Sequence, residues 1–295
     1  MIDASILIPT HRHTALLPYA IRSALDQESA SVEVLVVGDG VEDETREIIA
    51  GFGDESRVRF FDLPKAPRLG EAHRHSVLQE ARGRIVSYLS DDDVLLRDHI
   101  ADISPLLEDA DFCHSATAWI EQDGTFVFRP WDTARPEFVW YLRSGRGSIG
   151  LTAAAHTLEA YRRLPYGWRT TPAGMPTDRY MWLQWLDLPG FRGVTSHRLT
   201  HLHFPDPGWK VVPEEERARV LADWFERSRQ PGFREEIDAL METAIRRGGE
   251  DARLDARKLE LWLKAIQSTR TWRAHDWLVR FRPLRALLAR RPGAR

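Results

Sequence analysis

Short apolar runs alternate with amphipathic stretches through the first 90 residues of the chain. The apolar runs are rich in β-branched and aromatic residues, a pattern typical of strands buried on both faces of a sheet. The stretches between them favour helices, and in the first of these the apolar residues recur at helical spacing. The predicted strands cover 4–10, 32–40, 58–63 and 84–89, and the predicted helices cover 14–27, 42–52 and 70–82. This alternation predicts an α/β fold with a mostly parallel sheet.

Polar segments lie at the carboxyl ends of three of the predicted strands. They are Pro9-Thr10-His11, Gly38-Asp39-Gly40 and the run from Ser90 to Asp93. Ligands of parallel α/β sheets bind beyond the carboxyl ends of the strands. We therefore expect these three segments to lie together at one edge of the sheet and to form a ligand site.

The run Asp91-Asp92-Asp93 places three carboxylates next to one another. Repulsion between like charges disfavours this arrangement unless a cation lies among them. Adjacent carboxylates form a hard oxygen cluster of the kind that Mg²⁺ or Mn²⁺ accepts. A solvated acidic loop is the alternative, and the position at a strand end favours the metal site.

The second half of the chain has a looser pattern. Strand-like segments lie on either side of a turn signal at Asp123-Gly124, and residues 165–176 form a predicted irregular loop rich in proline and glycine. Thr177 follows this loop as a plausible helix N-cap. From Pro213 onward the chain consists almost entirely of helix-forming residues.

The composition is that of an ordinary globular protein, with 43% hydrophobic and 29% charged residues. The formal net charge of −3 gives the chain as a whole no affinity for polyanions, so we expect no nucleic-acid partner. A single cysteine, Cys113, excludes an internal disulfide and indicates a reducing compartment. We see neither a secretory signal nor an apolar run long enough for a membrane span, and we expect a cytoplasmic protein.

The last 26 residues differ sharply from the rest in charge. Residues 270–295 contain eight arginines and one acid, mixed with tryptophan, phenylalanine and leucine. This mixture is typical of a basic amphipathic helix that lies on an anionic membrane, which would place the protein peripherally on the inner face of the membrane. A helix docked on the rest of the protein with an arginine-rich outer face explains the pattern equally well.

Histidines occur in three pairs with one residue between them: His11/His13, His73/His75 and His201/His203. On a strand such a pair shares one face and could ligate zinc. The sequence offers no third clustered ligand, and we therefore expect no zinc site.

Three stretches resemble successive motifs of the GT-A-fold inverting glycosyltransferases of family 2, in the same order and at similar spacing. "SILIPTHRHTALLPYAIRSALDQ" is similar to the opening strand and helix of that family, and "EVLVVGDGVEDET" to its second strand. "RLGEAHRHSVLQEARGRIVSYLSDDD" resembles the helix and strand that lead into its metal-binding DxD motif. The resemblance implies a GT-A domain over 1–205, with a Rossmann-like sheet flanked by helices, and a helical C-terminal region over 206–295.

The resemblance also implies a nucleotide site. Pro9, Thr10 and His11 would line the pocket for the base, and Asp39 would accept a hydrogen bond from it. Several positions depart from the usual family pattern, including His11 and Gly38, so the resemblance does not name the nucleobase.

The diphosphate and metal positions follow from the third motif. Arg74 would lie near the diphosphate, and Asp91 would contact the ribose. Asp92 would bind the Mn²⁺ or Mg²⁺ that bridges the diphosphate, with Asp93 in the outer part of the same metal site. His203 resembles a histidine that touches the diphosphate or the metal in this family.

The family's catalytic base is a carboxylate at the start of a helix, and Asp178 matches it in spacing and context. An ordinary first-turn aspartate that stabilises the helix dipole is the alternative explanation for this residue. The residue before the base is usually glutamate in the family and is Thr177 here. Most of the tryptophans should be core residues, but we expect Trp168, in the 165–176 loop, to stack against the acceptor sugar.

The function implied is a metal-dependent inverting transfer of a sugar from a nucleoside-diphosphate sugar to an acceptor hydroxyl. The acceptor would be a saccharide or a lipid-linked molecule, in polysaccharide, glycolipid or other glycoconjugate synthesis. A nucleotidyltransferase is one alternative, although the segment after the first strand lacks the glycine-rich phosphate loop of that class. An inactive nucleotide-sugar-binding module is the other.

Overall fold

A computed structural model describes residues 2–129, 132–147, 149–205 and 209–268 of the chain. The chain divides into two compact units, Met1–Ala244 and Ile245–Arg295. The first unit holds the sheet and the candidate site. The basic tail at 270–295 lies outside the described residues. No helix among the described residues combines the length and the apolar character that crossing a bilayer requires.

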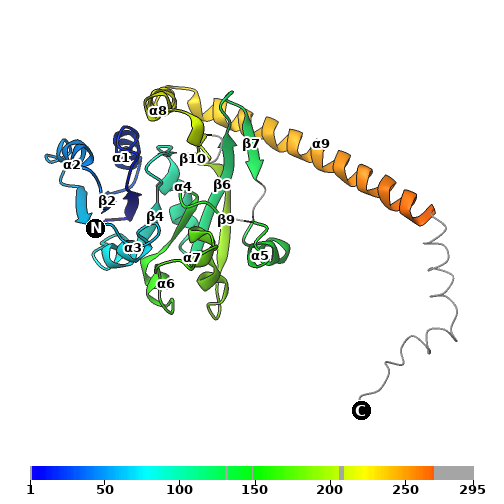
Figure 1. The fold of residues 1–295 in the computed structure, drawn as a ribbon, viewed down its shortest axis with the longest axis horizontal. Helices are drawn as coiled ribbons and strands as arrows, with labels where there is room; N and C mark the ends of the chain where they lie inside the picture. The colour runs from blue at the N-terminus through cyan, green and yellow to red at the C-terminus, as the bar shows by residue number, and fades with distance from the viewer. Residues whose placement is uncertain (1, 130–131, 148, 206–208, 269–295) are drawn as a thin grey trace, which may run out of the picture. The chain divides into compact units, whose positions relative to one another are not determined.

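An eight-stranded mixed sheet forms the centre of the first unit (Figure 1). The four strands from the start of the chain pair in parallel, in the order β3-β2-β1-β4, as the alternating pattern predicts. The later strands continue this sheet as β8-β6-β7 with antiparallel pairing, and β9 lies parallel to β6. The strands are β1 Ala4–Thr10, β2 Val32–Asp39, β3 Val58–Leu63, β4 Ile85–Tyr88, β6 Phe112–Ile120, β7 Phe126–Arg129, β8 Ala154–Thr157 and β9 Gly193–Leu199.

Two further strands, β5 (Val94–Leu95) and β10 (His201–Leu202), form a small antiparallel sheet of their own. This pairing brings the chain after His201 next to the acidic run that follows β4. The turn at Asp123-Gly124 joins β6 to β7, with Gly124 at φ +80°, which confirms the turn predicted there.

Helices cover both faces of the sheet in the first unit. The helices among the described residues are α1 Leu17–Leu25, α2 Asp43–Ala50, α3 Glu71–Leu78, α4 His99–Leu106, α5 Pro136–Arg143, α6 Leu158–Arg162, α7 Thr177–Leu186, α8 Glu214–Ser228 and α9 Phe233–Ser268, with a short 3₁₀ turn at Trp209–Val211. The three helices predicted within the first 90 residues are therefore present, each shorter than its predicted range.

The core follows from the alternation of side chains along the strands. Ile6 and Ile8 of β1 point to one face, where they pack with α1 and α4, whereas Leu7 points to the other face, toward α3, α6 and α7. Every residue of β2 is buried, which confirms that this strand is covered on both sides. A third cluster packs α8 and the first turns of α9 against the ends of β6 and β10.

Two local predictions are wrong. Pro176, and not Thr177, is the N-cap residue of α7; the Thr177 hydroxyl donates instead to the buried Glu71 carboxylate at 3.0 Å. Trp168 lies in the core with 2% of its surface exposed, and its indole N–H donates to the Tyr88 hydroxyl. A side chain so enclosed does not reach an acceptor, because the loop that carries it folds inward onto Tyr88 and Trp182.

Candidate active site

A cavity of about 610 Å³ opens at the carboxyl ends of β1, β2 and β4. The three polar segments that follow these strands all contribute to its wall, as their positions after parallel strands predict. The segment 65–70 before α3, Arg74 of α3, Leu151 and the start of α7 supply most of the remainder. Most of the predicted site residues line this cavity: Pro9, Thr10, His11, Asp39, Arg74, Asp91, Asp92 and Asp178. Asp93 and His203 are not in its lining and contact each other behind it.

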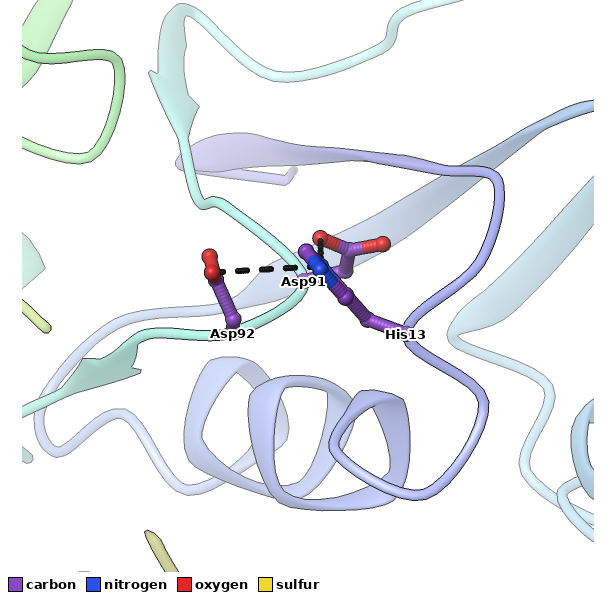
Figure 2. A group of neighbouring side chains, drawn as sticks. All are labelled: His13, Asp91 and Asp92. Atoms are coloured by element: carbon purple, nitrogen blue, oxygen red, sulfur yellow. Dashed lines mark hydrogen bonds and ion pairs between the residues drawn. The ribbon is translucent and has the colours of Figure 1, made fainter. Parts of the chain in front are cut away.

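Each carboxylate of the acidic run has its own cationic partner. Figure 2 shows the His13 ring beside the first two aspartates, with its Nδ1 2.8 Å from Asp91 and 3.8 Å from Asp92. Asp92 also accepts a hydrogen bond from the Arg217 guanidinium at 2.8 Å. The repulsion expected from the sequence is thus relieved by side chains of the protein itself.

Asp93 is the innermost of the three carboxylates, with 1% of its surface exposed. It pairs with His203 Nδ1 at 2.9 Å and accepts hydrogen bonds from the Thr152 hydroxyl at 2.5 Å and the Phe204 N–H at 3.2 Å. Its oxygens are therefore engaged by protein donors.

Burial and neighbouring charges shift the pKa values of Asp92, His13 and His203. Burial, reinforced by Asp93 and Asp91, raises the pKa of Asp92 to about 7. The hydrogen bond to Asp91 raises the pKa of His13 to about 9. Burial opposes the charge of His203, but the Asp93 carboxylate outweighs that effect and raises the pKa of His203 to about 9.

His13, Asp91 and Asp92 offer a set of ligand atoms that suits a divalent ion. Their nitrogen and oxygen atoms all lie within 4.8 Å of one another. Two carboxylates with one imidazole form a donor set that Mn²⁺ accepts well and Mg²⁺ accepts through the oxygens. The residues therefore fit the predicted metal, with His13 as a member that the sequence analysis missed. The roles predicted for Asp93 and His203 at the metal stay predictions.

Arg74 supplies the positive wall of the cavity. Its side chain is 5% exposed and stacks on Trp168, with its guanidinium carbon 4.7 Å from the ring centroid. Nε and Nη1 have no hydrogen-bond partner among the described residues, and burial lowers the pKa of this group. Buried donors without a partner are costly, so their presence at a cavity indicates an anionic ligand.

Asp39 lies at the end of β2 and is held by its surroundings. It accepts hydrogen bonds from Lys65 Nζ at 2.5 Å and from the Ala66 N–H at 2.6 Å. Gly70, at φ +68°, passes so close that a Cβ there would lie 2.7 Å from the Asp39 carboxylate. The proposed contact between Asp39 and a nucleobase stays a prediction. Lys65 and the neighbouring Arg68, which also line the cavity, were not identified from the sequence.

Asp178 lies in the first turn of α7, on the wall of the cavity. Burial raises the pKa of its carboxyl, against the opposing charges of Arg74 and His203. A carboxylate with a raised pKa takes up a proton more readily, as a general base must. The hydrogen bond from Thr177 to Glu71 ties the start of this helix to the start of α3.

Besides Lys65 and Arg68, the sequence analysis did not assign three residues that contact predicted site residues or their neighbours: His13, Arg217 and Glu71. A signal existed for His13, which belongs to one of the histidine pairs considered for zinc. Arg217 lies in the helical region and carries no motif, and Glu71 resembles any acid in the first turn of a helix.

The comparison with known proteins agrees with this geometry. The family model described as "Glycosyl transferase family 2" matches residues 5–166. The chain is 29% identical over 93 residues to GalNAc(5)-diNAcBac-PP-undecaprenol beta-1,3-glucosyltransferase of Campylobacter jejuni, a match that covers 31% of this chain and 30% of that protein. It is 34% identical over 98 residues to the succinoglycan biosynthesis protein ExoO of Rhizobium meliloti, covering 33% of this chain and 28% of that protein. The matched part thus spans less than a third of either relative.

Solved structures share the fold. The structure of S. aureus TarS 1–349 in complex with UDP-GlcNAc superposes with a TM-score of 0.55 at 13% identity, covering 83% of this chain and 72% of that one. Mannosyltransferase PcManGT from Pyrobaculum calidifontis, in complex with GDP-Man and Mn²⁺, superposes with a TM-score of 0.50 at 18% identity, covering 98% of this chain and 87% of that one. Together with the family match over more than half of its length, these findings establish that the chain belongs to glycosyl transferase family 2 and has the GT-A fold.

Proposed function

We propose that this protein transfers a sugar, with inversion, from a nucleoside-diphosphate sugar to an acceptor hydroxyl, with the help of a divalent ion. One observation carries the proposal: a single cavity combines the Asp91 and Asp92 carboxylates with the buried guanidinium of Arg74, whose Nε and Nη1 have no partner among the described residues. A ligand that binds to both Arg74 and the two aspartates needs anionic oxygens, which accept hydrogen bonds from Arg74. It also needs a bound cation, which the aspartates can coordinate. A nucleoside diphosphate with a bound divalent ion has this chemistry.

The donor would lie along the edge of the sheet. Pro9, Thr10 and His11 would hold the base, with Asp39 as a hydrogen-bond acceptor, and Asp91 would contact the ribose. The buried hydroxyl of Thr10 has no partner among the described residues, which agrees with a ligand at this end of the cavity. Arg74 would bind the diphosphate, with Lys65 and Arg68 adding positive charge at the rim.

His13, Asp91 and Asp92 would hold the ion, with Asp93 and His203 supporting them from behind. When bound, a divalent ion neutralises charge on the departing diphosphate as a Lewis acid. The protein's own contribution is to hold the ligand atoms in place before the donor arrives, through the contacts of Asp93 with Thr152 and His203.

Asp178 would act as the general base. In a direct displacement the acceptor oxygen attacks the anomeric carbon from the face opposite the leaving diphosphate, so the configuration inverts. The acceptor hydroxyl gives its proton to the Asp178 carboxylate as the new C–O bond forms and the bond to the diphosphate breaks. The raised pKa of Asp178 favours this transfer.

The acceptor that we propose is a saccharide or a lipid-linked molecule of a glycoconjugate pathway. The names of the relatives support this class, since one acts on a glycan carried on undecaprenol diphosphate and another is a succinoglycan biosynthesis protein. The basic tail at 270–295 would bring the enzyme to the inner face of the membrane, where a lipid-linked acceptor lies.

We also propose that residues 1–205 carry the donor site and the base, and that residues 206–295 form an accessory helical region. In the structure the first compact unit extends to Ala244, and Arg217 of the accessory region reaches Asp92. The part of the accessory region that belongs to the first unit is therefore in contact with the catalytic part.

The test is a panel of UDP-, dTDP- and GDP-sugars with and without Mn²⁺. A donor that binds only the folded protein raises the melting temperature, and the matching donor should do so mainly with Mn²⁺ present. Release of the nucleoside diphosphate in the presence of an acceptor supports sugar transfer. Release of pyrophosphate would indicate a nucleotidyltransferase instead, and donor binding without any turnover would indicate an inactive binding module.

A further inference from the structure

Arg217 is a side chain of the accessory region that reaches the acidic run. It lies in the first turn of α8 with 8% of its surface exposed. Its Nη2 donates to Asp92 Oδ2 at 2.8 Å, and the two residues are 125 positions apart in the sequence. A nearly buried arginine is unusual unless it has a partner, and Asp92 provides one.

The position of Arg217 is fixed by the packing of its helix. Leu221, Trp224 and Phe225 of α8 are buried in the third core cluster. At the start of α8 the Glu214 carboxylate accepts a hydrogen bond from the Ala15 N–H at 2.8 Å, which ties this turn to the segment between β1 and α1. The guanidinium is therefore held against Asp92 by contacts that do not depend on any ligand.

The contact bears directly on metal binding. The oxygen of Asp92 that Arg217 occupies, Oδ2, is also the one nearest to His13. A divalent ion on Asp92 would lie within a few ångströms of the guanidinium, where repulsion between the two cations is strong. The ion and the arginine thus compete for the same carboxylate.

We propose that Arg217 is the built-in counterion of Asp92 and a gate on the metal site. A divalent ion binds Asp92 fully only when the guanidinium gives up its hydrogen bond, so the first turn of α8 sets the ion concentration at which the site fills. The inference rests on the proposed function in one respect, that Asp92 is a metal ligand. Through this contact the accessory region influences how readily the ion occupies the metal site.

The experiment measures the affinity of the full chain for Mn²⁺ alone, without nucleotide, from the electron paramagnetic resonance signal of the free ion. Arg217→Met removes the charge and keeps the length of the side chain. We expect it to bind Mn²⁺ at least about tenfold more tightly than the wild type, which corresponds to about 1.4 kcal/mol. Arg217→Lys, which keeps the charge, should stay within about threefold of the wild type. Arg219→Met, on an exposed position of the same helix, is the matched control and should change nothing.

An Arg217→Met protein that is folded by circular dichroism and binds Mn²⁺ no more tightly than the wild type would overturn the gate. If this variant does not fold, Arg217→Gln, which keeps a polar side chain, replaces it under the same criterion. Asp92→Asn separates the two proposals. If Asp92→Asn binds Mn²⁺ as well as the wild type does, Asp92 is not a metal ligand and the proposed metal site is wrong. If Asp92→Asn loses Mn²⁺ binding while both neutral variants at Arg217 bind Mn²⁺ like the wild type, the metal site stands and only the proposed role of Arg217 is wrong.

Discussion

Two groups of histidines in this protein have opposite charge states. His13 and His203 lie at the ligand edge of the sheet beside Asp91 and Asp93, and these carboxylates help to raise the pKa of each to about 9. Three others lie inside the fold and bond to hydroxyls and backbone carbonyls, and burial lowers the pKa of each to about 4: His99, His114 and His156.

The difference lies in the partners. His99 is typical of the interior group, with its two ring nitrogens 3.0 Å from the Ser87 hydroxyl and 2.8 Å from the Thr200 hydroxyl. Hydroxyls satisfy a neutral imidazole without stabilising an imidazolium, whereas a carboxylate stabilises the charged form. The interior histidines thus make neutral polar contacts, whereas those at the carboxyl edge of the sheet are paired with charges. A site that binds a metal ion and a diphosphate needs such charged groups.

The largest effect should come from removing a charge at the edge. Asp178→Asn keeps the shape of the side chain and removes the base, so we expect turnover to fall by about 10³-fold while donor binding stays close to that of the wild type. Steady-state rates of nucleoside diphosphate release, with donor affinity from calorimetry, measure both. Asp187→Asn at the exposed end of the same helix is the control. Near-normal turnover in Asp178→Asn would remove the base from the mechanism.

Next in size is the loss of a proposed metal ligand. Asp92→Asn should weaken the Mn²⁺-dependent binding of the nucleoside diphosphate by about 100-fold, because an amide oxygen is a poorer ligand than a carboxylate. Calorimetry with and without Mn²⁺ gives the metal-dependent part. Asp123→Asn, in the exposed turn between β6 and β7, should bind like the wild type. An unchanged Mn²⁺ dependence in Asp92→Asn would place the ion elsewhere.

A substitution in the interior group should affect stability and leave ligand binding intact. His99→Leu leaves the hydroxyls of Ser87 and Thr200 without their partner, and we expect the free energy of unfolding to fall by about 2 kcal/mol at pH 7. Urea denaturation measures this change, with the exposed His197→Leu as the control.

The same variant tests the charge state of His99. The wild-type histidine has a lower pKa when folded than when unfolded, so the unfolded chain binds more protons between pH 6.5 and about 4. Acidification through this range should therefore lower the free energy of unfolding of the wild type more than that of His99→Leu. The difference in this free energy between the two proteins should narrow as the pH falls. A constant difference would mean that His99 is not held neutral.

The smallest effect should have the opposite pH dependence. The pKa of His203 is higher in the folded state, so its contribution is complete below pH 6.5 and is lost as the pH rises through about 9. His203→Gln keeps a donor for Asp93 and loses the charge, and we expect it to be about 1 kcal/mol less stable at pH 6 in the absence of divalent ions. The difference in free energy of unfolding between the wild type and His203→Gln should narrow as the pH rises from 6.5 to 9. If it widens instead, the edge and the interior do not differ in the way described.

Much of the fold is predictable from the sequence because local patterns encode it. The apolar runs that become β1, β2 and β4 are buried on both faces, which fixes them as central strands, and the polar segments at their carboxyl ends necessarily meet at one edge. That reasoning places Thr10, Asp39 and Asp92 on one cavity, as the structure finds. It fails at Trp168, since a proline- and glycine-rich loop does not reveal from its own residues whether it turns outward or folds into the core.

Local patterns along the chain are enough to predict the class of fold, the edge that carries the site and an acidic run in need of a cation. The identity of the cations follows from long-range packing. His13, His203 and Arg217 lie 78, 110 and 125 positions away from the aspartates that they contact. Periodicity and motif spacing report on neighbours along the chain, whereas these pairs form because β1 lies beside β4, β5 pairs with β10, and α8 packs in the third core cluster.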